Sequence, residues 1–170
     1  MNAAHYIGKN CLMVIFLIMA ISLKAVSSTK STIDYTHNDP AEQSLITFAK
    51  KLLGVKYKYG AASPSQGFDC SGFVHYVFKQ FGITLPRSSS AIGQTGDNIS
   101  LAEAKAGDII LFTGTNPAKR IIGHVGIVLS NNKGKELRFI HASSGKAYAV
   151  TETSLEGSYK KRFMKVIRVI

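Results

Sequence analysis

The apolar positions between residues 45 and 82 recur every three or four residues, which is the period of an amphipathic α-helix. The first run comprises Leu45, Phe48, Ala49, Leu52 and Leu53, and the second comprises Phe73, Val74, Val77, Phe78 and Phe81. We expect the first helix to stop at Gly54 and the second to stop at Gly82, with Asp69 or Ser71 as its N-cap. Residues 57–65 are rich in turn formers and are predicted to form a loop.

Beyond residue 105 the apolar runs become short and are separated by turn residues, which is typical of β-strands. The predicted strands are residues 109–112, 125–129, 137–142, 147–151 and 164–170. Helices followed by a meander of strands predict an α+β fold, with helices packed on one face of a roughly five-stranded antiparallel sheet. The chain has no internal repeat, so we expect one domain over residues 41–170.

The amino-terminal segment has a different composition. Residues 11–23 are mostly apolar and lack acids, but they are fewer than the roughly 20 residues that a membrane span needs. We interpret residues 1–27 as a cleavable signal peptide and residues 28–40 as a flexible lead-in. Lys24 is unusual so near a cleavage site, so an uncleaved membrane anchor is the alternative. We expect an exported protein, periplasmic or extracellular, with no stable membrane anchor after cleavage.

The chain is strongly basic, with a formal net charge of +11. Removal of residues 1–27 takes away Lys9 and Lys24 and no acid, which leaves +9. This charge favours an anionic partner such as a cell-wall polymer, or it serves only to keep the protein soluble. No nucleic-acid-binding motif is present, so nucleic acid is not expected as a partner.

Cys70 is the only cysteine outside the leader, because Cys11 lies within it. A single thiol in an exported protein has no internal disulfide partner, so it is either a buried apolar residue or a nucleophile. Cys70 stands where the second helix should begin. The free backbone N–H groups of a helix N-terminus favour a thiolate, and they can also donate to the oxyanion of a tetrahedral intermediate.

Two histidines supply the groups that such a nucleophile needs. His124 at the start of a predicted strand can act as the base, and His141 on the following strand can hold its ring in the correct tautomer. Each histidine can also have a purely structural role. Cys70, His124 and His141 could instead bind zinc, although they lack the close spacing of strong zinc motifs. We expect no cofactor and no metal.

A series of motifs extends this interpretation to the whole domain. They are GVKYKYG at 54–60, GFDCSGFV at 67–74, LPRSS at 85–89, AGDIILF at 106–112, GHVGIV at 123–128 and FIHASS at 139–144. In this order they resemble the NlpC-type cell-wall peptidases, which are papain-like cysteine hydrolases of bacterial peptidoglycan. The resemblance covers residues 41–170 and implies a papain-like single domain.

The resemblance also implies a role for each matching residue. Cys70 would be the nucleophile, His124 the base and His141 the orienting residue. Tyr57 would help to form the oxyanion pocket, and Asp69 would pair with a substrate ammonium group. The groove would be lined by Ser71, Arg87 and Ser88. The implied reaction is hydrolysis of the D-γ-glutamyl–diamino acid amide, usually with meso-diaminopimelate, in the peptide stems of peptidoglycan.

Three positions depart from the family pattern: Lys56, Ala61 and Ile92. None is a proposed catalytic residue, so the departures bear on peptide preference.

Two other functions remain open on this fold. A non-catalytic wall-binding module should have lost a central residue, and all three are intact. A thiol acyltransferase acting on lipid should have an apolar groove, whereas residues 87–95 are mostly polar.

Overall fold

The computed structural model describes residues 40–132 and 136–170. The predicted signal peptide and residues 28–39 of the predicted lead-in lie outside the described residues, and Pro40 is the first residue of a helix. Among the described residues, none of the helices combines the length and apolar character needed to cross a membrane.

The two predicted helices are present. They are α2 (Pro40–Lys50) and α3 (Cys70–Lys79), and two short helices that the periodicity did not predict are α4 (Ser89–Ile92) and α5 (Gly157–Arg162). Asp69 is the N-cap of α3, because its Oδ1 accepts a hydrogen bond from the Gly72 N–H at 2.7 Å. The helix α4 was missed because one turn is too short to carry a period, and α5 because it is mostly polar.

The strands form two antiparallel sheets. A two-stranded sheet pairs β1 (Ala62–Ser63) with β2 (Gly67–Phe68), within and just after the predicted loop. The main sheet has the order β3-β8-β4-β5-β6-β7. Its strands are β3 (Asp97–Ile99), β4 (Ile109–Thr113), β5 (Ile122–Asn131), β6 (Leu137–Ala142), β7 (Val150–Ser154) and β8 (Phe163–Arg168).

The predicted fold class is confirmed, with two differences in the sheet. The described sheet has six strands rather than about five, because β3 is a short polar edge strand without an apolar pattern. The predicted strand at 147–151 is displaced to Val150–Ser154. A turn occupies its start: the Tyr148 N–H donates to the Gly145 carbonyl at 2.9 Å, and Tyr148 has φ 45°.

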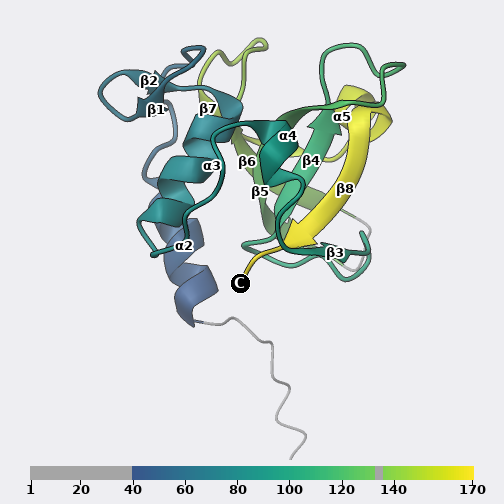
Figure 1. Ribbon diagram of the computed structural model, residues 1–170, viewed down its shortest axis with the longest axis horizontal. Helices are drawn as coiled ribbons and strands as arrows, with labels where there is room; N and C mark the ends of the chain where they lie inside the picture. The colour runs from purple at the N-terminus through teal and green to yellow at the C-terminus, as the bar shows by residue number, and fades with distance from the viewer. Residues whose placement is uncertain (1–39, 133–135) are drawn as a thin grey trace, which may run out of the picture. The chain divides into compact units, whose positions relative to one another are not determined.

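Apolar side chains pack against both faces of the sheet. Helices α2 and α3 lie on one side, where α3 contacts β5 and β6, and α5 lies by β4 on the other side (Figure 1). Alternate residues of β4 point to opposite faces. Ile109 and Leu111 join the cluster beneath α3, whereas Ile110 and Phe112 join a second cluster with Phe139. Strand β4 is therefore buried on both faces.

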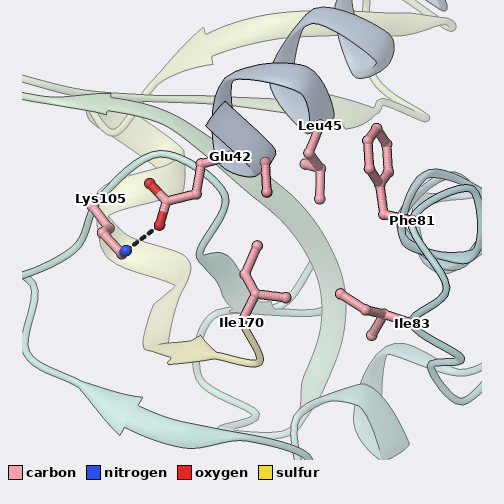
Figure 2. Close-up of a pocket in the computed structure, with 7 residues that line it drawn as sticks. Glu42, Leu45, Phe81, Ile83, Lys105 and Ile170 are labelled. Atoms are coloured by element: carbon pink, nitrogen blue, oxygen red, sulfur yellow. Dashed lines mark hydrogen bonds and ion pairs between the residues drawn. The ribbon is translucent and has the colours of Figure 1, made fainter. Parts of the chain in front are cut away.

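A cavity of about 220 Å³ lies where α2, the end of α3 and the carboxyl terminus meet. Figure 2 shows Leu45, Phe81 and Ile170 lining it, and the dashed line joins Glu42 to Lys105. Glu42 is 4% exposed, so its carboxylate depends on Lys105 for charge compensation. This ion pair ties α2 to the loop before β4.

We predict that Lys105→Ala lowers the free energy of unfolding by about 1–3 kcal/mol, because it leaves the Glu42 carboxylate buried without its counterion. Urea denaturation measures the change. The double variant Glu42→Gln/Lys105→Ala should recover part of the loss, since no buried charge remains. A double variant less stable than Lys105→Ala would contradict this explanation.

Candidate active site

Cys70 is the first residue of α3 and packs against the main core cluster. The N–H groups of Ser71 and Val125 face its sulfur and favour the thiolate. Burial and then the Asp69 carboxylate act against ionisation, and together they raise the pKa of the Cys70 thiol. The backbone amides at the helix N-terminus therefore favour the thiolate, as expected, but burial and Asp69 outweigh them in the resting site.

His124 and His141 lie side by side on adjacent strands, as the sequence predicted. The Nε2 atom of His124 lies 2.8 Å from the Nδ1 atom of His141, and the rings meet edge to face at 88°. Gly126 makes this approach possible. A Cβ atom there would lie 2.9 Å from the Ile140 carbonyl oxygen and 3.2 Å from the His141 Cβ.

A β-bulge precedes His124. Phe112 pairs with His124 while Thr113 pairs with Ile122, so Gly123 is an extra residue in β5. Bulges of this kind redirect the following side chain, and they are frequent beside active sites. Because Val125 follows His124 directly and its N–H faces the Cys70 sulfur, this bend lies at the thiol. The His124–His141 bond uses Nε2 of His124, so Nδ1 is the ring atom available to act as a base.

Aromatic rings surround the two imidazoles. Tyr159 on α5 lies 5.2 Å from the His141 ring and 6.0 Å from the His124 ring, measured between centroids. Phe112 and Phe139 complete the enclosure. The Arg162 guanidinium lies over the Tyr159 ring, 5.4 Å from its centroid.

This environment keeps both histidines uncharged. Burial, followed by His141 and Arg162, lowers the pKa of His124 well below its ordinary value. Burial and then Arg162 lower the pKa of His141 to about 4. At neutral pH the site therefore holds a neutral thiol beside two neutral imidazoles.

Asp69, Ser71 and Arg87 form one hydrogen-bonded network at the start of α3. Arg87 donates to both oxygens of Asp69 at 2.8 Å, and the Ser71 hydroxyl donates to Oδ1 at 3.2 Å. Burial opposes ionisation of Asp69, but Arg87 and the N–H groups of Gly72 and Gly60 outweigh it and lower the pKa of the carboxyl. Asp69, which was expected to pair with a substrate ammonium group, is thus paired with Arg87, which was expected to line the groove.

The expected oxyanion residue Tyr57 and the expected groove residue Ser88 lie at separate places. Burial raises the pKa of the Tyr57 phenol, and the charge of a Cys70 thiolate would raise it further. Its ring packs against Tyr148 with centroids 5.5 Å apart. Ser88 caps α4 by accepting a hydrogen bond from the Ala91 N–H at 3.2 Å.

No group of three or more His, Cys, Asp or Glu side chains in the described part of the chain has the geometry of a metal site, so the zinc alternative has no geometric support.

The NlpC/P60 family model matches residues 54–168. This chain belongs to the NlpC/P60 family. Gamma-DL-glutamyl hydrolase of Bacillus subtilis (strain 168) is 39% identical over 133 residues, which are 76% of this chain and 30% of that protein. Murein DD-endopeptidase MepS/Murein LD-carboxypeptidase of Escherichia coli (strain K12) is 36% identical over 118 residues, which are 69% of this chain and 57% of that protein. The chain thus spans only part of the length of these relatives.

Solved structures of the NlpC/P60 family share the fold. The crystal structure of an NLP/P60 family protein similar to a lipoprotein, from Staphylococcus aureus, superposes with a TM-score of 0.67 at 34% identity; the match covers 78% of this chain and 42% of that one. The NlpC/p60 domain of the peptidoglycan hydrolase SagA gives a TM-score of 0.61 at 30% identity over 75% of this chain and 98% of that domain. The resemblance noted in the sequence and the papain-like α+β fold are both confirmed.

Sequence reasoning missed the residues that surround the NlpC/P60 histidine pair. Tyr159 and Arg162 lie on the mostly polar helix α5, and nothing in their spacing indicates that they lie near the two histidines. Thr153, which contacts His141, lies on the edge strand β7, and Tyr148, which packs against Tyr57 and not against the histidines, lies in a turn. Tyr148 is exposed and has a left-handed φ angle. The sequence gave no sign of this, because the φ angle is set by the fold.

We predict that Arg87→Ala destabilises the protein by about 2 kcal/mol, because it removes both charge-assisted hydrogen bonds from a carboxylate that is 8% exposed. Arg138→Ala is the matched control. Its partner Glu152 and Arg138 itself are more exposed, with side-chain values of 23% and 44%, so the loss should stay below about 1 kcal/mol. Equal losses in urea denaturation would contradict the assignment.

The buried histidines should make stability depend on pH. The unfolded chain exposes them with a pKa near 6.5, so between this value and about 4 the unfolded state binds more protons than the folded state. The free energy of unfolding should therefore fall as the pH is lowered through this window, by up to about 1.4 kcal/mol per pH unit for each histidine. The pKa of Asp69 is lowered from 3.8, so the stability that its ionised form provides is lost only below about pH 3.8.

His141→Asn removes one of the two histidines that take up a proton on unfolding. The slope of the free energy of unfolding against pH should therefore fall by about half. Urea denaturation at several pH values between about 4 and 7 measures it. An unchanged slope in the variant would show that His141 is not the buried neutral group responsible.

Proposed function

We propose that this protein is a peptidoglycan hydrolase: a cysteine endopeptidase that cleaves the D-γ-glutamyl–diamino acid amide, with meso-diaminopimelate as the diamino acid, through Cys70, His124 and His141. The observation that carries the proposal is the 2.8 Å His124–His141 contact, next to the Val125 amide that faces the Cys70 sulfur. This arrangement provides a nucleophile, a base and an orienting group at one helix terminus. Membership of the NlpC/P60 family supports the same reaction class.

The first half-reaction forms a thioester. Nδ1 of His124 takes the thiol proton while the Cys70 sulfur attacks the amide carbon, and the carbonyl electron pair moves to oxygen. Because the pKa of the thiol is raised and that of the imidazole is lowered, the proton moves during the attack rather than before it. His124 then gives this proton to the leaving amine as the carbon–nitrogen bond breaks.

The second half-reaction releases the acid. His124 takes a proton from water, whose oxygen attacks the thioester carbon, and the proton returns to the sulfur as it leaves. In both steps the negative oxygen of the intermediate needs donors. We assign this role to the Tyr57 hydroxyl and to the first N–H groups of α3. The raised pKa of Tyr57 keeps its phenol protonated and able to donate.

The substrate groove is proposed to begin at the Asp69–Ser71–Arg87 network and to continue to Ser88. A substrate ammonium group would share the Asp69 carboxylate with Arg87, whose side chain is 39% exposed and so remains accessible. The carboxylates of the wall peptide would meet Arg87 from the solvent side. Oriented charge pairs of this kind fix the peptide as well as bind it.

The names of two relatives point to different bonds. The Bacillus subtilis relative is named for a γ-glutamyl bond, which supports the proposed site of cleavage. The Escherichia coli relative is named as a DD-endopeptidase and LD-carboxypeptidase, which makes a D,D bond of wall peptides the second candidate. Export to the cell envelope, directed by residues 1–27, is part of the proposal because the substrate lies there.

We predict that the purified full chain releases wall-peptide fragments ending at D-γ-glutamate, and that Cys70→Ala and His124→Ala reduce the rate at least about 100-fold. Mass spectrometry of muropeptides identifies the bond. His75→Ala is the matched control, since His75 lies on α3 and its ring contacts the carbonyl of Leu85, in the segment after the helix, rather than the thiol. It should retain most of the activity.

The fragment masses and the thiol reactivity together separate the alternatives. Products of D,D cleavage would replace the proposed bond by the second one. No cleavage with a thiol that still reacts with iodoacetamide would favour acyl transfer to another substrate. No cleavage with an unreactive thiol would indicate a wall-binding module, and full activity in Cys70→Ala would refute the mechanism.

A further inference from the structure

Thr153 lies next to the histidine pair on β7, the edge strand beyond β6. Its Oγ1 atom is 3.0 Å from the Nε2 atom of His141. In the register of the two strands, Thr153 is opposite Phe139 and Thr151 is opposite His141. Thr153 is therefore the diagonal neighbour of His141 on the same face of the sheet, a position from which side chains can meet. The contact extends the chain of polar groups from His124 through His141 to a hydroxyl.

The two contacts of His141 are coupled through its proton. A neutral imidazole carries one N–H, so one ring nitrogen donates and the other accepts. If Nε2 of His141 donates to Thr153, its Nδ1 accepts from Nε2 of His124, and Nδ1 of His124 is left with a free lone pair. If the threonine hydroxyl donates instead, every tautomer reverses, and Nδ1 of His124 carries a proton. Only the first state can take a proton from Cys70.

The protonated, charged form of His124 requires the same tautomer of His141. Once His124 has taken the thiol proton, both of its nitrogens are donors, so Nδ1 of His141 must accept. The proton of His141 must then be on Nε2, and its partner must be an acceptor. His141 is 0% exposed, and Phe139 and Tyr159 pack against its ring. The Thr153 hydroxyl is the acceptor that the fold provides, and it is half-buried.

We propose that Thr153 is a positioning residue of the active site: its hydroxyl accepts the His141 Nε2 proton and thereby fixes the tautomers of both histidines for catalysis. The inference rests on the proposed function, because it assigns His124 as the base. Thr153 does not touch the reacting atoms. Its effect passes through two hydrogen bonds, of 3.0 Å and 2.8 Å.

Thr153→Val removes the hydroxyl and keeps a β-branched side chain of nearly the same shape. We expect kcat on purified muropeptides to fall about 10- to 100-fold with KM changed less than about threefold, because binding groups are untouched. Thr153→Ser restores a hydroxyl at the same position and should recover activity to within about fivefold of the natural protein. The thermal midpoint of each variant reports whether the fold is intact.

Nitrogen-15 NMR of the natural protein supplies a test that needs no variant. Protonated and unprotonated ring nitrogens have well-separated shifts, so the tautomers can be assigned directly. His141 and His124 should each carry their proton on Nε2 at neutral pH. In Thr153→Val we expect a mixture of tautomers for His141. Both histidines protonated on Nδ1 in the natural protein would overturn the inference.

The kinetic outcomes separate this inference from the function on which it rests. If Cys70→Ala and His124→Ala keep their activity, the proposed function fails. If those variants are inactive but Thr153→Val keeps kcat within about twofold of the natural protein, the proposed function stands and the role of Thr153 fails. If Thr153→Ser is as impaired as a stably folded Thr153→Val, side-chain shape rather than the hydroxyl is responsible, and the inference is again overturned.

Discussion

The packing of the first turn of α3 against the start of β5 is the contact on which the candidate site depends. It sets Cys70 next to the Val125 amide, one residue after His124, although the two residues are far apart in the sequence. On its other side, the same turn packs closely against the residue before β1, and Gly72 is needed there because a Cβ atom would overlap the Ala61 carbonyl oxygen. Asp69 secures the same turn as the N-cap, and Arg87 fixes the Asp69 carboxylate in place. The residues that cap α3 are therefore also the residues that hold the candidate active site together.

Burial governs the electrostatics of the site. It raises the pKa of Cys70 and lowers the pKa of both histidines, so the resting state contains no thiolate–imidazolium pair. The Arg162 cation above Tyr159 acts in the same direction on the imidazoles. A neutral site costs less to desolvate than an ion pair, and it leaves the charge to develop when the substrate is attacked. In the proposed mechanism, the amides around the sulfur would stabilise the charged states that form during the reaction.

Membership of the NlpC/P60 family and the geometry of the site are two separate kinds of observation, and they agree. The family match identifies a fold and a motif order, and it covers only part of the length of several relatives. The geometry shows that Asp69 and Arg87, both expected at the substrate, already satisfy each other's charge. Their proposed part in substrate binding must therefore be compatible with their role in stabilising the start of α3.

The sequence by itself determined the two principal helices, most of the strands and the order of the motifs, because these depend on local periodicity and on turn and capping residues. It also indicated Cys70, His124 and His141 as candidate catalytic residues, because few side chains can act as a nucleophile or a base. Only the tertiary structure decided that Asp69 binds Arg87, that Tyr159 and Arg162 cover the imidazoles and that Thr153 bonds to His141. Edge strands and one-turn helices carry too few apolar residues to show a period. Contacts between them arise from how strands pair and sheets twist, and no local pattern in the chain encodes that.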